Sequence, residues 1–184
     1  MNKPEMIIKA IRHDLLLETS KGVDAGGHVF GAVVLDKATL CPVIAGSNNR
    51  MENPIYHGEV ETLRRFFACP NHPKPKDCIF VASHDPCPMC ISAIAWAGFD
   101  EVWVLFNYED VKKSFGMPVD LLMYKEIFGA EGARPQNAFF KKYDLKAEAA
   151  KEENAEQLAA AISEIEALYA QIGKQVRDFD YPGM

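Results

Sequence analysis

The sequence predicts an α/β domain in which helices pack on a central mixed β-sheet. In the middle of the chain, short segments rich in β-branched residues alternate with helical patterns, which gives the order β-β-α-β-α-β. The chain has 184 residues, of which 48% are hydrophobic and 25% charged. This composition is typical of a globular protein, and the length suits one domain of about 150 residues with an appendage.

The first predicted element is a helix over Pro4–Thr19, where apolar residues recur at helical spacing. A glycine-containing loop follows, and two strands joined by a turn at Asp36-Lys37 form a predicted hairpin. Beyond a loop with Asn and Pro, helices and strands alternate. After the first helix we expect strands over 28–35 and 41–47, a helix over 57–68, a strand over 78–83, a helix over 87–97 and a strand over 101–107.

The remainder of the chain is predicted to be mostly helical. One helix is expected over Pro118–Phe128 and a long amphipathic helix over Leu145–Val176, where the composition shifts to Ala and Glu. The apolar stripe of this long helix comprises Leu158, Ile162, Ile165, Tyr169, Ile172 and Val176. We therefore divide the chain into a main domain, 1–144, and a C-terminal helix and tail, 145–184, that packs on the domain or on a second subunit.

Charge and cysteine content restrict the class of protein. The net charge of −6 disfavours a nucleic-acid partner, which usually needs a basic face. Five cysteines are an odd number without a disulfide framework, so a secreted scaffold is not expected. No apolar run approaches the roughly 20 residues that cross a membrane, and charges interrupt the N-terminal segment. We expect a cytoplasmic protein without a membrane partner.

Two motifs carry residues suited to metal chemistry. His57 and Glu59 open one predicted helix, and Cys87 and Cys90 open the next, after an intervening strand. Loops at the carboxyl ends of neighbouring parallel strands meet in one crevice, so the two helix starts should face each other. One imidazole and two thiolates supply three zinc ligands and leave a fourth position for water, as in catalytic zinc sites.

The carboxylate of Glu59 is suited to proton transfer at such a site. It lies two residues past a metal ligand and can take a proton from water at the metal and deliver it to a leaving group. A Cys-x-x-C motif alone also fits a redox or structural zinc site, and His-x-Glu alone carries little information. Their combination, with Pro86 directly before the first cysteine, favours a catalytic site.

The combined pattern, His57-Gly58-Glu59 followed by Pro86-Cys87-Pro88-Met89-Cys90, resembles the cytidine-deaminase-like superfamily. The resemblance covers about Gly26–Phe128. It implies a three-layer α/β/α fold and a zinc-dependent hydrolytic deaminase. In that case His57, Cys87 and Cys90 bind Zn²⁺, and Glu59 is the catalytic acid and base.

Local resemblances indicate a small heterocyclic substrate. The segment HGEVETL is similar to fungal cytosine deaminases, whereas PCPMCISAIAWA and Phe115–Ile127 are similar to bacterial guanine deaminases. Guanine is the first expected substrate and cytosine the second; a pterin, a triazine or a modified base stays open. The substrate contacts that follow are Asn49, with Asn48 as the alternative, and Trp96, Phe115, Asp120, Phe179 and Tyr181.

Two other functions remain as alternatives. A tRNA adenosine deaminase would share the zinc site, but it would need a basic groove that a net charge of −6 disfavours. A non-catalytic zinc module that assembles through the C-terminal helix would have no need of Glu59. The expected partner is a small heterocyclic substrate, and deaminases of this type are usually dimers, so we expect a homodimer.

Overall fold

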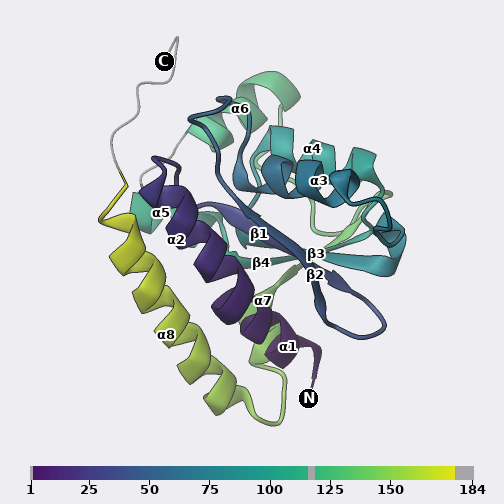
Figure 1. Ribbon diagram of the computed structural model, residues 1–184, viewed down its shortest axis with the longest axis vertical. Helices are drawn as coiled ribbons and strands as arrows, with labels where there is room; N and C mark the ends of the chain where they lie inside the picture. The colour runs from purple at the N-terminus through teal and green to yellow at the C-terminus, as the bar shows by residue number, and fades with distance from the viewer. Residues whose placement is uncertain (1, 116–118, 177–184) are drawn as a thin grey trace.

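A computed structural model describes residues 2–115 and 119–176, without the side chains of residues 114 and 115 (Figure 1). Its centre is a five-stranded sheet in the order β2-β1-β3-β4-β5. Strand β1 is antiparallel to β2 and β3, while β3, β4 and β5 run parallel to one another. The strands are β1 (Gly31–Asp36), β2 (Pro42–Ser47), β3 (Cys78–His84), β4 (Glu101–Phe106) and β5 (Lys141–Asp144).

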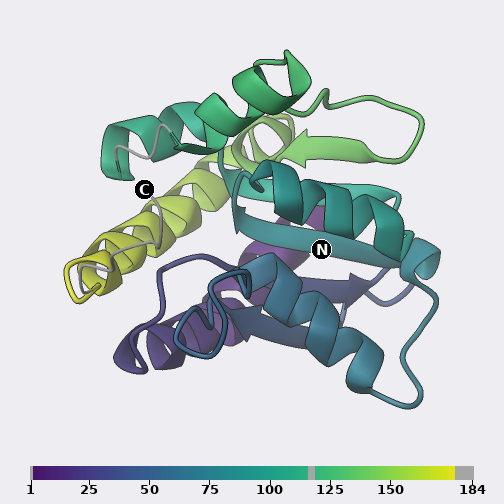
Figure 2. The same cartoon turned by 90° about the horizontal axis from the view of Figure 1, so that it is seen from above.

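Helices cover both faces of the sheet, which confirms the predicted three layers (Figures 1 and 2). Helices α3, α4 and α6 lie on one face, and α1, α2, α7 and α8 lie on the other. The helices are α1 (Lys3–Ala10), α2 (Leu16–Asp24), α3 (Gly58–Ala68), α4 (Pro88–Ala97), α5 (Tyr108–Phe115), α6 (Val119–Phe128), α7 (Leu145–Ala149) and α8 (Ala155–Gly173). A 3₁₀ turn over Pro75–Asp77 precedes β3.

The sheet separates two hydrophobic clusters, because successive side chains of a strand point to opposite faces. On β3, Ile79 and Val81 belong to the cluster beneath α1 and α8. Cys78 and Phe80 belong to the cluster beneath α3 and α4. Every residue of β3 is buried, as expected for a central strand covered on both faces.

The first helix is longer than predicted. It continues past Thr19 to Asp24, through a π-helical turn at Ile11–Leu15 that joins α1 to α2. The π turn adds a residue to one turn of the helix and so shifts the phase of the apolar stripe. Ile11, Leu15 and Val23 all remain buried as a result. The helix therefore ends five residues later than predicted, at Asp24 instead of Thr19.

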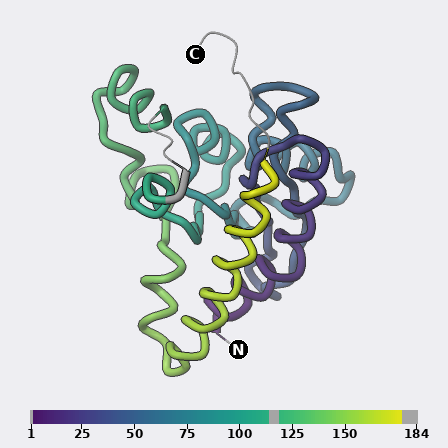
Figure 3. The backbone as a smooth tube through the Cα atoms, turned by 90° about the vertical axis from the view of Figure 1, so that its left-hand side faces the viewer, coloured from purple at the N-terminus to yellow at the C-terminus, as the bar shows by residue number. Residues whose placement is uncertain are grey.

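The prediction of one continuous helix over Leu145–Val176 is wrong. The chain forms a short α7, turns at residues 150–154 and then forms α8. The apolar stripe itself is confirmed within α8, since Leu158, Ile162, Ile165 and Tyr169 are buried in the same cluster as the first helix. Figure 3 shows α8 lying beside that helix. The turn is what allows α8 to pack on the domain.

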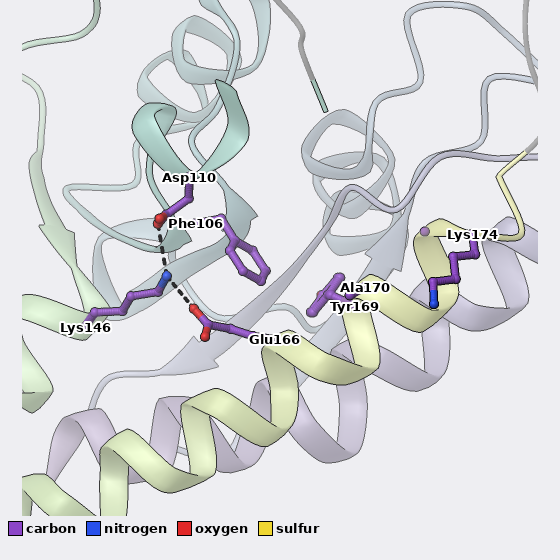
Figure 4. Close-up of a pocket in the computed structure, with 8 residues that line it drawn as sticks. Phe106, Asp110, Lys146, Glu166, Tyr169, Ala170 and Lys174 are labelled. Carbon is purple, nitrogen blue, oxygen red and sulfur yellow. Dashed lines mark hydrogen bonds and ion pairs between the residues drawn. The ribbon is translucent and has the colours of Figure 1, made fainter. Parts of the chain in front are cut away.

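Ion pairs join α7 to α5 and to α8. Lys146 of α7 lies 3.0 Å from Asp110 of α5 and 2.5 Å from Glu166 of α8 (Figure 4). These side chains line a cavity of about 580 Å³ together with Phe106 and Tyr169.

Helix α5 and strand β5 were not predicted from the sequence. Among the described residues, no helix is long and apolar enough to cross a membrane.

Candidate metal centre

The two predicted motifs meet at the N-termini of α3 and α4. His57 is the N-cap of α3 and Cys87 is the N-cap of α4, with Cys90 in the first turn. The ligand atoms of His57, Cys87 and Cys90 all lie within 4.8 Å of one another. His57 Nδ1 is 3.6 Å from Cys87 Sγ, and both cysteines are buried. The structure therefore brings the three predicted ligands together.

Gly58 permits the close approach that places His57 and Glu59. A Cβ atom at Gly58 would lie 2.4 Å from the carbonyl oxygen of Phe30 and 2.5 Å from Cα of Gly31. Both contacts are with backbone atoms at the start of β1, which cannot rotate away. Only a residue without a side chain fits between the two motif residues at this point of α3.

The electrostatics of the cluster favour a thiolate at Cys87. Hydrogen bonding from the Cys90 thiol, and then the hydrogen bond and charge of His57, lower the pKa of Cys87 to about 4. Burial lowers the pKa of His57, but the hydrogen bond and charge of Cys87 outweigh it and the net shift is upward. Burial raises the pKa of the Cys90 thiol. A bound cation would stabilise both cysteines as thiolates.

Glu59 is a buried carboxyl group beside the three ligands. Only 5% of its surface is exposed. Burial, and next the charge of Cys87, raise the pKa of Glu59 to about 7. A carboxyl group with a pKa near neutrality both accepts and donates a proton at the operating pH, as a general acid and base must.

Among the predicted substrate contacts, Asp120 interacts electrostatically with the metal ligands Cys87 and His57. It lies in the first turn of α6. Burial, and next the charge of Cys87, raise the pKa of Asp120 to about 6, and the charge of His57 opposes this shift. Asp120 is thus a second acidic side chain within the electrostatic field of the metal ligands. Its contact with a substrate stays a prediction.

The two candidate asparagines have different surroundings. Asn48 is only 2% exposed, and its Oδ1 accepts hydrogen bonds from the backbone N–H groups of His28 and Arg50. Asn49 is half-buried, and its Nδ2 donates to Glu52 Oε2 at 2.6 Å. Asn48 therefore joins the start of β1 to the loop before α3. The assignment of Asn49 to the substrate stays a prediction.

The structure places Trp96 on the surface of α4, and its contact with a substrate stays a prediction. Helix α4 turns Cys90, Ile91 and Ile94 toward the protein, and Trp96 is 92% exposed on its outer face. Trp96 lies six residues past Cys90, which corresponds to about 9 Å along a helix. Phe179, Tyr181 and the side chain of Phe115 lie outside the described residues.

Sequence reasoning missed the side chains that hold the loop before Cys87. The hydroxyl groups of Tyr108 and Tyr124 donate to the carbonyl oxygen of Pro86 at 2.6 and 3.4 Å. Lys142 Nζ contacts both carboxylate oxygens of Asp85, at 2.6 and 2.8 Å. No local motif marks these residues, because they come from α5, α6 and β5.

The donor set suits zinc. Two cysteine sulfurs and one histidine nitrogen are typical ligands of this ion, and three protein ligands leave one position for water or substrate. The second cysteine follows the first by three residues at a helix N-terminus, so both thiols reach the same point. The residues present therefore fit a catalytic zinc ion.

Solved structures share the fold. The crystal structure of guanine deaminase from Bacillus subtilis matches with a TM-score of 0.55 and 28% identity, over 75% of this chain and 82% of that chain. A mutant of the protein NE0047 in complex with 8-azaguanine matches with a TM-score of 0.53 over 90% of this chain and 84% of that chain. At 19% identity, the second match supports the fold alone.

Sequence comparison gives the family. Guanine deaminase of Bacillus subtilis is 34% identical over 110 residues, which make up 58% of this chain and 68% of the relative. The family model described as the cytidine and deoxycytidylate deaminase zinc-binding region matches residues 7–106, which include His57, Glu59, Cys87 and Cys90. This match covers more than half of the chain, and the chain therefore belongs to the cytidine and deoxycytidylate deaminase zinc-binding family.

Proposed function

We propose that this protein is a zinc-dependent hydrolytic deaminase that converts guanine to its oxo product and ammonia. The observation that carries the proposal is the buried Glu59, with a pKa raised to about 7, beside the ligand set of His57, Cys87 and Cys90. The chain is 34% identical to a guanine deaminase over 110 residues, which supports guanine as the substrate over other amino-heterocycles.

The reaction replaces the exocyclic amino group of the base by the oxygen of water. A C–O bond forms at the ring carbon, the C–N bond breaks and ammonia leaves. When bound, zinc lowers the pKa of water to about 7. Glu59 takes the first proton from the attacking water and delivers it to the ring nitrogen as the C–O bond forms. It then takes the second proton from the added hydroxyl group and delivers it to the amino group, which leaves as ammonia. Burial disfavours the charged carboxylate and so helps Glu59 to hold each proton.

The substitution Glu59→Gln tests this role. We expect the variant to keep zinc, because the ligands are unchanged, and to lose about 10²–10⁴-fold in turnover with guanine. Glu109→Gln is the control, since the Glu109 side chain is 71% exposed on α5. Full activity of Glu59→Gln with guanine would refute the proposed mechanism.

Ammonia release from the zinc-loaded protein tests the substrate. The panel is guanine, cytosine, adenine, their nucleosides, aminopterins and aminotriazines. We expect guanine to give the highest kcat/KM. A higher value for another member would refute guanine as the substrate, and silence across the panel would refute the proposed substrate class.

We also propose that the protein forms a homodimer and works in the cytoplasm. The α8 stripe is not available as an interface, because it is buried within the chain. Exposed aromatic side chains instead line a groove between α4, the end of α6 and the segment 133–140. Trp96, Phe128 and Phe139 are 92%, 58% and 72% exposed there. Such apolar patches often mark interfaces. A reducing compartment would keep the Cys87 and Cys90 thiols free for metal.

A further inference from the structure

The loop that carries Cys87 is short and held on several sides. It joins the end of β3 at His84 to the start of α4 at Pro88. Cys87 caps α4, and its Sγ accepts a hydrogen bond from the backbone N–H of Cys90 at 3.5 Å. A displacement of Asp85 or Pro86 therefore moves the Cys87 sulfur relative to His57.

Pro86 offers a single polar backbone group, because proline has no N–H. That group, the carbonyl oxygen, accepts the hydroxyl of Tyr108 at 2.6 Å and the hydroxyl of Tyr124 at 3.4 Å. Tyr108 opens α5 and Tyr124 lies on α6. The residue next to the metal ligand is thus held by side chains from two other helices.

Asp85 is held from the sheet. Its backbone N–H donates to the carbonyl oxygen of Phe106 at the end of β4. Its carboxylate makes two contacts with Nζ of Lys142 on β5, at 2.6 and 2.8 Å. The pair is largely removed from solvent, since the side chains of Lys142 and Asp85 are 13% and 8% exposed. A buried pair with two contacts fixes the orientation of both partners.

Lys142 also connects the two sets of contacts. Its Nζ lies 5.8 Å from the centre of the Tyr108 ring, over the ring face. The ammonium group therefore bonds to Asp85 and lies near the ring of Tyr108, the residue that holds Pro86. Lys142, Asp85 and Tyr108 form one connected unit directly before the first cysteine ligand, which we name the loop brace.

We propose that Lys142 and Tyr108 are positioning residues that set the place of the Cys87 sulfur in the metal site. The inference rests on the proposed function only in that the bound metal is zinc. Strand β5 then has a role beyond closing the edge of the sheet, because it supplies the cation of the loop brace. Residues that orient metal ligands typically change metal affinity by about 10–100-fold when they are removed.

The variants are Lys142→Met, Tyr108→Phe and the double variant Asp85→Asn/Lys142→Met. Lys142→Met keeps the side-chain length and removes the charge, while Tyr108→Phe removes one hydroxyl group. The double variant removes both charges and leaves no unpaired buried ion. The control is Lys141→Met, because Lys141 is the exposed neighbour of Lys142 on β5.

Two readouts follow the metal and one follows the metal-free protein. Competition with a chromophoric chelator gives the Kd for Zn²⁺, and the thiolate absorption bands of the Co²⁺-loaded protein report the geometry of the ligands. Alkylation of the metal-free protein with iodoacetamide, followed by peptide mass spectrometry, gives the reaction rate of Cys87. Thermal unfolding is measured on every variant, so that loss of fold is separated from loss of positioning.

We expect Lys142→Met and Tyr108→Phe to raise the Kd for Zn²⁺ about tenfold or more, to shift the Co²⁺ bands and to speed the alkylation of Cys87. The double variant should regain thermal stability without regaining zinc affinity. Lys141→Met should match the parent protein. Unchanged zinc affinity, Co²⁺ bands and alkylation in both single variants would overturn the inference. A parent protein that binds no zinc would instead refute the proposed function, and alkylation would still test the loop brace.

Discussion

The substitution Gly58→Ala tests the link between the fold and the metal site. The added Cβ would lie 2.4 Å from the carbonyl oxygen of Phe30 and 2.5 Å from Cα of Gly31. Non-bonded carbon atoms prefer separations of about 3.5–4.0 Å. The start of β1 or of α3 must therefore move by about 1 Å. Since Gly58 lies between His57 and Glu59, a movement of α3 displaces a metal ligand and the catalytic carboxyl group together.

The expected loss of stability follows from the atoms involved. Overpacking a filled site costs about 1–3 kcal/mol, and two backbone contacts place this site near the upper value. For a protein of this size, 3 kcal/mol lowers Tm by roughly 6–12 °C. Thermal unfolding followed by circular dichroism measures Tm, and chelator competition measures the Kd for Zn²⁺. We expect both stability and zinc affinity to fall.

Gly98→Ala is the control for general destabilisation. Gly98 has a φ of +90°, which is unfavourable for alanine, but its added Cβ would meet nothing closer than 3.9 Å. It caps the far end of α4, away from the ligands. This variant should lose about 1–2 kcal/mol and keep the zinc affinity of the parent. If Gly58→Ala kept the Tm and zinc affinity of the parent protein, the inference that this close approach of α3 and β1 positions the metal ligand would be wrong.

Two further predictions concern pH and assembly. Burial lowers the pKa of His84 to about 3, so below pH 6.5 the unfolded chain binds a proton that the folded protein does not. The free energy of unfolding should fall by roughly 2 kcal/mol through His84 between pH 6.5 and 4.5. Urea titrations of His84→Gln should show a shallower dependence of this free energy on pH, and equal slopes would contradict the prediction. Trp96→Asp should convert the proposed dimer to a monomer, as measured by light scattering. The control Leu17→Asp, at a residue 55% exposed on α2, should leave the dimer intact. A dimer that persists in Trp96→Asp would exclude the groove beside α4 as the dimer interface.

The central fold and the ligand set were predictable because both depend on local patterns. Four of the five strands are apolar enough to be recognised by composition. Helices α3 and α4 begin directly after the motif residues His57 and Cys87. Strand β5 has the sequence KKYD and four residues. Such a segment becomes a strand only by pairing with β4 at the sheet edge, where charged side chains are tolerated.

The helical errors have a similar cause. The turn at residues 150–154, AKEEN, contains neither Gly nor Pro, so the sequence offers no strong helix breaker between α7 and α8. The break is stabilised by packing, because α8 must reverse direction to bury its stripe beside the first helix. Helix α5 is mostly polar and begins where Asn107 and Asp110 bond to each other's backbone N–H groups, a cap rather than an apolar pattern.

Some features of the site depend on local sequence and others on tertiary contacts. The motif residues are adjacent in the sequence, and their identities alone indicate zinc chemistry. The position of the Cys87 sulfur, however, depends on Asp85 and Lys142, which are 57 residues apart and meet only when β5 joins the sheet. A chain with the same motif but no cation at this place would keep the ligands and lose this control over their geometry. Function at this site therefore depends on an edge strand that the sequence pattern does not reveal.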